Sequence, residues 1–233
     1  MPVGHVNQIR RYPVKSLQGE ALRRAQVDAR GLTGDRQWTV RNHAGKFGSG
    51  KNTKRFVRID GLSRLRARYD DDAAIIMLPD GREHPAGTRE ADVEISRLFG
   101  QPLHLATEGD VSHFDDGPVH LVTTSSVAAL AADSGVAFDW RRTRANLLIT
   151  TSELTGFAED EWLGRRLRLG EQVVLTIEMR MPRCVMVNLP QEELPADGRM
   201  LKAVTAANDA TLGVLGTVKR AGTVRIGDPV DLI

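Results

Sequence analysis

The chain has 233 residues, and its 41% hydrophobic and 27% charged content is typical of a folded globular protein rather than a disordered one. Its 32 basic and 30 acidic residues give a formal net charge of +2, which excludes a general affinity for nucleic acid or anionic lipid. The single cysteine excludes an internal disulfide and a cysteine-rich zinc site, and it indicates a reducing compartment.

Short apolar segments alternate along the chain with Gly, Pro, Asp and Asn residues. Each has the length of a strand rather than of a helix. These predicted strands are 3–9, 25–28, 37–40, 74–78, 103–106, 119–123, 146–150, 166–169, 173–179, 212–221 and 230–233. Three segments, 88–99, 125–132 and 159–163, predict helices. The pattern therefore predicts a mainly β protein with a few helices (α+β), built from barrels rather than from a layered sheet.

Two polar segments interrupt this pattern. Residues 109–118 are rich in turn formers and lie near the middle of the chain, so they predict a linker between two domains, 1–108 and 109–233. Residues 190–200 predict a surface loop.

The sequence carries no signal for export, for a membrane or for nucleic acid. Residues 1–16 lack an apolar stretch and a cleavage signal, and no later segment is long enough to span a bilayer, so we expect a cytoplasmic protein without a membrane partner. Residues 45–58 are basic and contain Phe47 and Phe56, a pattern that superficially suits phosphate tracking. With the charge balanced over the whole chain, we expect no nucleic-acid partner.

Cys184 follows Met181, Pro182 and Arg183 directly after a predicted strand. A neighbouring guanidinium favours the thiolate, which is the form that attacks or coordinates a metal. A free cysteine is also often an inert, buried hydrophobic residue, and the isolated motif does not decide between the two interpretations.

Three other segments carry groups suited to an anion. Lys15 and Ser16 offer an ammonium, a hydroxyl and turn-like backbone donors, a combination that suits a phosphate. Arg36 stands at the start of a strand, and Arg141, Arg142 and Arg144 enter another. Such close arginines repel one another unless an anion or carboxylates lie nearby, although a solvated edge would also accommodate them.

Residues 156–162 concentrate three carboxylates beside Trp162. These acidic side chains suit either the first turn of a short helix, where they complement its dipole, or the rim of a cofactor site. The helix start is the better interpretation for Glu159 and Glu161.

Taken in order, these segments resemble the MOSC domain proteins, the family of the molybdenum cofactor sulfurase C-terminal domain. The resemblance rests on 12–16 (YPVKS), 35–36 (DR), 144–146 (RAN), 159–162 (EDEW), 183–184 (RC) and 227–230 (GDPV). It implies a MOSC-type β-barrel at 109–233, preceded by a smaller N-terminal β-rich domain at 1–108.

The resemblance also implies a molybdenum cofactor (Mo-molybdopterin) and the residues that bind it. Lys15, Ser16 and Arg36 would hold its phosphate end, and Arg144 and Asn146 would contact the pterin. Cys184 would bind molybdenum. Three further residues resemble the family pattern: Thr123 and Ser126 as cofactor contacts, and Asp160 as a catalytic acidic residue.

The amidoxime-reducing branch of the family implies an oxidoreductase that reduces N-hydroxylated or N-oxygenated small molecules. This chain has Val185 to Pro190 where that branch has Thr-Thr-Val-Asp-Pro, so the polarity of the substrate pocket differs. It has no further cysteines for an iron–sulfur cluster, and we expect electrons from a separate ferredoxin, cytochrome b5-like protein or flavin reductase. The alternative is a carrier of molybdenum cofactor, or of sulfur as a persulfide on Cys184, without turnover of its own.

Overall fold

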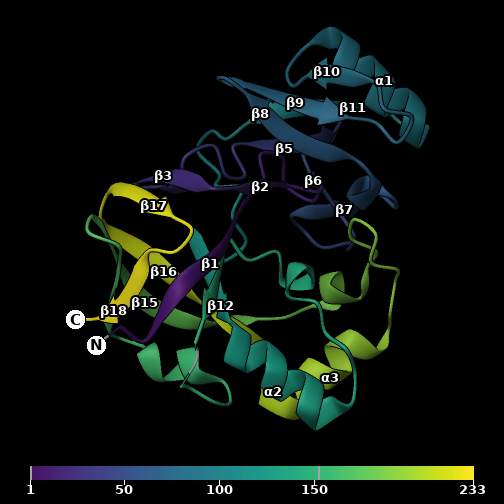
Figure 1. The fold of residues 1–233 in the computed structure, drawn as a ribbon. Coiled ribbons are helices and arrows are strands. Elements are labelled where there is room, and N and C mark those ends of the chain that lie inside the picture. The colour runs from purple at the N-terminus through teal and green to yellow at the C-terminus, as the bar shows by residue number, and fades with distance from the viewer. Residues whose placement is uncertain (1, 152) are drawn as a thin grey trace.

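The largest sheet of the computed structural model, which describes residues 2–151 and 153–233, is closed into a barrel (Figure 1). Its strands are β1 (Gly4–Arg11), β12 (Val119–Thr123), β13 (Leu147–Thr150), β14 (Arg166–Leu169), β15 (Val173–Pro182), β16 (Thr211–Arg220) and β18 (Pro229–Leu232). They are paired in the order β13-β12-β16-β15-β14-β18-β1, and β1 also pairs with β13, which closes a barrel of 7 strands. Only β12 and β13 run parallel within it.

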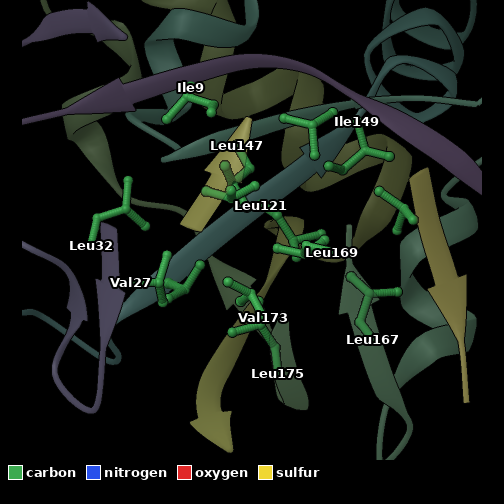
Figure 2. Close-up of a cluster of buried hydrophobic side chains, with 14 of the residues drawn as sticks. Ile9, Val27, Leu32, Leu121, Leu147, Ile149, Leu167, Leu169, Val173 and Leu175 are labelled. Carbon is green, nitrogen blue, oxygen red and sulfur yellow. The ribbon is translucent and has the colours of Figure 1, made fainter. Parts of the chain in front are cut away.

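Branched aliphatic side chains fill the barrel. Figure 2 shows part of this cluster, with Ile9, Leu121, Leu147 and Leu169 among its members. Because successive side chains of a strand point to opposite faces, Leu121 joins the inner cluster while Val122 joins a second cluster under the helices. The strand β12 is therefore buried on both faces, which explains why three of its five residues, Val119, Leu121 and Val122, are aliphatic.

Two helices, α2 (Thr124–Ser134) and α3 (Arg199–Asn208), lie against each other on the outside of the barrel (Figure 1). The hydroxyl of Thr123 accepts a hydrogen bond from the Ser126 N–H and so caps the start of α2. The short 3-10 helices of this part are η2 (Trp140–Thr143), η3 (Ala158–Trp162) and η4 (Val185–Asn188). No helix within the described ranges has the length and apolar surface needed to cross a bilayer.

The residues between β1 and β12 form smaller sheets. One contains β11 (Leu103–Thr107), β5 (Trp38–Asn42), β6 (Phe47–Ser49) and β7 (Phe56–Arg58), and another contains β10 (Glu83–Pro85), β9 (Ala73–Met77) and β8 (Arg66–Asp70). Helix α1 (Arg89–Phe99) buries Ala91 and Ile95 in the core of this part, which also includes Leu62 of η1 (Leu62–Arg64).

Hydrogen bonds connect the first and last parts of the chain. Strand β1 belongs to the barrel, and β2 (Glu20–Leu22) extends the sheet from it. A small sheet joins β17 (Gly222–Arg225) to β3 (Arg24–Asp28) and β4 (Gly31–Leu32). The domain boundary between residues 108 and 109 stays a prediction. Strand pairs such as β1 with β13 and β3 with β17 join residues from its two sides.

The predicted fold class is confirmed, since the described part of the chain is mainly β with three α-helices. Each predicted strand corresponds to an observed strand, and the three predicted helices correspond to α1, α2 and η3. Helix α3 was not predicted. Its N-cap residue is Gly198, without a side-chain cap, and its first turn has no acidic residue; the carboxylate that accepts from the Arg199 N–H belongs to Asp197, one residue before the usual position.

Candidate functional site

A cleft lies where the 109–118 segment and residues near β1 and β5 meet the ends of the barrel strands. Its space is about 790 Å³ including the open mouth, within the range of small-molecule sites. Five cationic and two acidic side chains line it. The lining residues are Lys15, Ser16, Arg36, Ser49, Phe114, Asp115, Asp116, Gly117, His120, Arg142, Thr143, Arg144, Asn146, Met181, Pro182, Arg183, Cys184, Met186, Val187 and Leu215.

The structure brings six of the nine sequence-predicted site residues to this one cleft: Lys15, Ser16, Arg36, Arg144, Asn146 and Cys184. They come from two parts of the sequence, 15–36 and 144–184, which are separated by more than a hundred residues. Their roles toward a cofactor stay predictions.

Cys184 is a free, partly exposed thiol in the cleft wall. Strand β15 ends at Pro182, and the N–H of Arg183 still donates to the Ala210 carbonyl at 2.7 Å. Cys184 then occupies the N-cap position of η4, in extended backbone. The thiol is therefore held between a barrel strand and a short helix.

The buried guanidinium of Arg183 anchors the backbone between β15 and η4. It donates to the carbonyls of Leu212 and Thr143, both at 2.9 Å, and it contacts His120 Nε2. Burial lowers the pKa of Arg183 to about 9, so the side chain stays charged at neutral pH. Burial, together with the Arg183 charge, lowers the pKa of His120 well below its usual value, and the imidazole is therefore neutral.

Arg144 and Arg36 form a cationic wall. Arg144 has φ 54° at the end of η2, and Arg36 has φ 51°. Their guanidinium carbons lie 4.3 Å and 4.9 Å from the ring centroid of Tyr12, and Arg36 Nη2 donates to the Arg144 carbonyl at 3.0 Å. Arg36 also pairs with Asp35.

The Nη2 atom of Arg144 is buried and has no hydrogen-bond partner among the described residues. Burial lowers the pKa of Arg144 to about 10, which leaves it protonated at neutral pH. A buried donor of a charged group is costly when it is left unpaired. The cleft therefore contains a cation suited to an anionic ligand.

The three close arginines have different partners. Arg141 pairs with Asp139, Glu192 and Glu193, and Arg142 donates to the carbonyls of three residues, Val187, Leu189 and Pro195. Carboxylates or carbonyls thus satisfy Arg141 and Arg142. Of the three, only Arg144 has a buried side-chain donor without a partner among the described residues.

Lys15 is buried at the cleft, where its Nζ donates to the His113 carbonyl at 2.7 Å and to Asp115 Oδ1 at 2.9 Å. Burial lowers the pKa of Lys15 to about 8. Ser16 has φ 69°, and its hydroxyl donates to the Gly48 carbonyl at 2.9 Å. At neutral pH Lys15 remains mainly an ammonium.

Asn146 lines the cleft, but its side-chain amide is engaged with the backbone. Its Nδ2 donates to the Arg10 carbonyl at 3.2 Å, and its Oδ1 accepts from the His120 N–H at 3.1 Å. Asn146 therefore braces β1 against β12 beneath the cationic wall.

Three predicted residues lie outside this cleft. Thr123 and Ser126 are fully buried, and their hydroxyls donate to the Glu159 carboxylate, whose pKa is raised by burial. Asp160 accepts from Asn208 Nδ2 at 2.9 Å and pairs with Arg180 at 3.4 Å. These contacts tie η3 to β12, α2, β15 and α3.

Several residues that line the cleft were not predicted from the sequence. His120 stands inside an apolar strand sequence, and nothing there distinguishes it from a core residue. The predicted linker, 109–118, contributes Phe114, Asp115 and Asp116 to the cleft wall. Its turn formers indicated a loop correctly, but turn chemistry does not reveal what a loop covers.

No group of three or more His, Cys, Asp and Glu side chains is placed to hold a metal ion within 2–151 and 153–233.

Comparison with known proteins gives a consistent result. The family model described as MOSC domain matches residues 97–231, and the one described as MOSC N-terminal beta barrel domain matches residues 3–111. A comparison with curated proteins gives no match.

The solved structures that match the chain include the following two. The YuaD protein (APC1665) of Bacillus subtilis has a TM-score of 0.54 and 14% identity, over 97% of this chain and 93% of that chain, which supports the fold alone. YiiM of Geobacillus stearothermophilus has a TM-score of 0.38 and 17% identity, over 50% and 54% of the two chains. Since the MOSC domain model covers more than half of the sequence, the chain belongs to the MOSC family, and a MOSC N-terminal β-barrel domain precedes its MOSC domain.

Proposed function

We propose that the protein binds the molybdenum cofactor in the cleft and uses it to reduce N-hydroxylated or N-oxygenated compounds. The MOSC family is associated with molybdenum cofactor binding. The observation that carries the proposal is the buried Nη2 of Arg144, which has no hydrogen-bond partner in the described part of the chain, on a residue that lines the same cleft as Cys184.

The side chains of the cleft fit such a group. Lys15, Arg36 and Arg144 would hold its anionic end, since desolvated phosphate oxygens need cationic donors. Cys184 would be the protein's ligand to molybdenum, a metal that accepts thiolate sulfur. Arg183 and His120 would keep that thiol in place through the backbone corner at the end of β15.

When bound, the cofactor supplies two-electron redox chemistry. The net reaction consumes two electrons and two protons for each N–O bond broken, and it yields the reduced nitrogen compound and water. The chain would orient the reactants, while Met181, Met186 and Leu215 in the cleft wall would exclude water. With Cys184 as its only cysteine, the chain has no ligand set for an iron–sulfur cluster, so a separate electron-transfer protein would deliver the electrons.

Turnover with a chemical reductant tests the reductase activity. Protein purified from cells that make molybdopterin is incubated with the reductant and benzamidoxime, and benzamidine is quantified. We expect product from the wild type and none above background from Cys184→Ala. Wild-type protein that contains molybdenum but forms no product would contradict the proposal.

The same experiment distinguishes the second candidate, a carrier of cofactor or of sulfur. This function is favoured by the partial exposure of Cys184 and by the absence of another cysteine that could resolve a persulfide. A carrier would bind the cofactor, or show a persulfide on Cys184 in intact mass spectra, without reducing benzamidoxime.

A further inference from the structure

The 109–118 segment supplies both partners of the Lys15 ammonium. One is the His113 carbonyl, and the other is the carboxylate of Asp115. The same segment is anchored separately, because Arg55 Nη2 donates to the Phe114 carbonyl at 3.0 Å and also contacts the Ser112 carbonyl. Asp115 can therefore move while the backbone around it stays attached.

The two members of the Lys15–Asp115 pair differ in exposure. The side chain of Lys15 is 7% exposed, and that of Asp115 is 41% exposed. A buried ammonium needs a partner at all times, whereas an exposed carboxylate regains water when it leaves. If an anion enters the cleft, Asp115 is the member of the pair that can be exchanged.

Asp115 lines the same cleft as Lys15 and Arg36, two of the cations proposed to hold the anionic ligand. The charges of Lys15, Lys51 and Arg36 all act on its carboxylate, and Arg36 lines the cleft beside it. An incoming phosphate and the Asp115 carboxylate would therefore compete for the same positive field.

We infer that Asp115 is an intramolecular competitor that occupies Lys15 in the ligand-free protein and yields this position to the anionic end of the cofactor. The carboxylate keeps Lys15 paired when the cleft is empty and lowers the affinity of the cleft for anions. A ligand without a negative charge has nothing to exchange for the carboxylate and leaves the pair intact. The inference rests on the anion site of the proposed function.

Asp116 provides a matched control. It lines the same cleft and carries the same charge, yet within the described part of the chain its side chain forms no ion pair and no hydrogen bond. Asp116→Asn thus changes the net charge of the cleft as Asp115→Asn does, without releasing Lys15.

The test uses full-length, cofactor-free protein from cells that do not make molybdopterin. Inorganic phosphate is titrated by calorimetry into the wild type, Asp115→Asn, Asp116→Asn, Lys15→Gln and the double variant Lys15→Gln/Asp115→Asn. We expect Asp115→Asn to bind phosphate about fivefold tighter and Asp116→Asn to differ from the wild type by less than about twofold. In the Lys15→Gln background, Asp115→Asn should raise the affinity for phosphate by no more than Asp116→Asn does in the wild type.

Equal effects of Asp115→Asn and Asp116→Asn would overturn the inference and leave the anion site standing, because general charge would then explain both. A persistent gain in the Lys15→Gln background would also overturn it. No phosphate binding in any of the proteins would overturn the anion site and the inference together. Thermal melting of each variant verifies that it is folded before titration.

Discussion

Arg144 shows at the scale of one residue how function conflicts with stability. Its guanidinium lies beside the Tyr12 ring with Nη2 buried, and no carboxylate among residues 2–151 and 153–233 pairs with it. The contact with an aromatic ring stabilises a cation by about 0.5–1 kcal/mol, while desolvation of an unpaired charge costs several kcal/mol. An anionic ligand bound beside Arg144 would offset the free-energy cost of burying this cation.

Replacing Arg144 with Met should separate these two effects. We expect the unfolding free energy of the ligand-free protein to rise by about 1–4 kcal/mol, because relief of the desolvation penalty outweighs the lost ring contact. Molybdenum content after expression in a competent host should fall severalfold. Urea unfolding and mass spectrometry of the metal measure the two outcomes.

The control for this prediction is Arg141→Met, which changes an arginine three positions before Arg144 in the sequence. It removes ion pairs with Asp139 and Glu192 outside the cleft and should lower stability by about 1 kcal/mol, with molybdenum retained. Full molybdenum content in Arg144→Met would remove Arg144 from the proposed site.

Single residues of the site were partly predictable. Lys15, Arg36, Arg144 and Cys184 carry functional groups that stand out in the sequence, and the order of their motifs placed them together. Asn146 also lines the cleft, but its amide bonds to backbone that folding brings from β1 and β12. Such partners cannot be read from the residue type.

At the scale of elements, the start of α2 explains why two predicted cofactor contacts lie elsewhere. Thr123 caps α2 and donates to Glu159, and Ser126 donates to the same carboxylate. A Ser- and Thr-rich segment before a helix suits a cofactor contact and a helix cap equally well. The sequence does not show that the carboxylate comes from η3, which the fold places beneath the helix.

Thr123→Val tests this structural role. Loss of the cap and of a buried hydrogen bond to Glu159 should lower the unfolding free energy by about 1–3 kcal/mol. Molybdenum per folded molecule should match the wild type. The exposed Thr205→Val, on α3, should change stability by less than about 0.5 kcal/mol. If Thr123→Val kept its stability but lost molybdenum, Thr123 would be a cofactor contact instead.

At the scale of the whole molecule, the cleft depends on pairing between the ends of the chain. Strand β1 contributes Val6 and Ile9 to the barrel core, and it pairs with both β13 and β18. The short apolar segment 3–9 predicted a strand, but its sequence does not specify which strands are its neighbours. The sequence therefore predicted a barrel without revealing that its first strand comes from the other end of the chain.

A fragment of residues 109–233 should consequently fail to fold cooperatively. Without β1, the barrel would expose the edges of β13 and β18 and lose part of its core. We expect a fragment that aggregates or melts without a sharp transition in circular dichroism, and the full chain to melt in one transition. A fragment with a cooperative transition near that of the full chain would show that the predicted boundary delimits an independent domain.

The central claim is that Cys184 binds molybdenum in a cofactor held by the cationic wall. Its most direct test is the molybdenum and pterin content of wild-type and Cys184→Ala protein from a host that makes molybdopterin, measured by mass spectrometry of the metal and fluorescence of the oxidised pterin. We expect metal and pterin together in the wild type and a severalfold loss of molybdenum in Cys184→Ala. Equal molybdenum in the two proteins would contradict it.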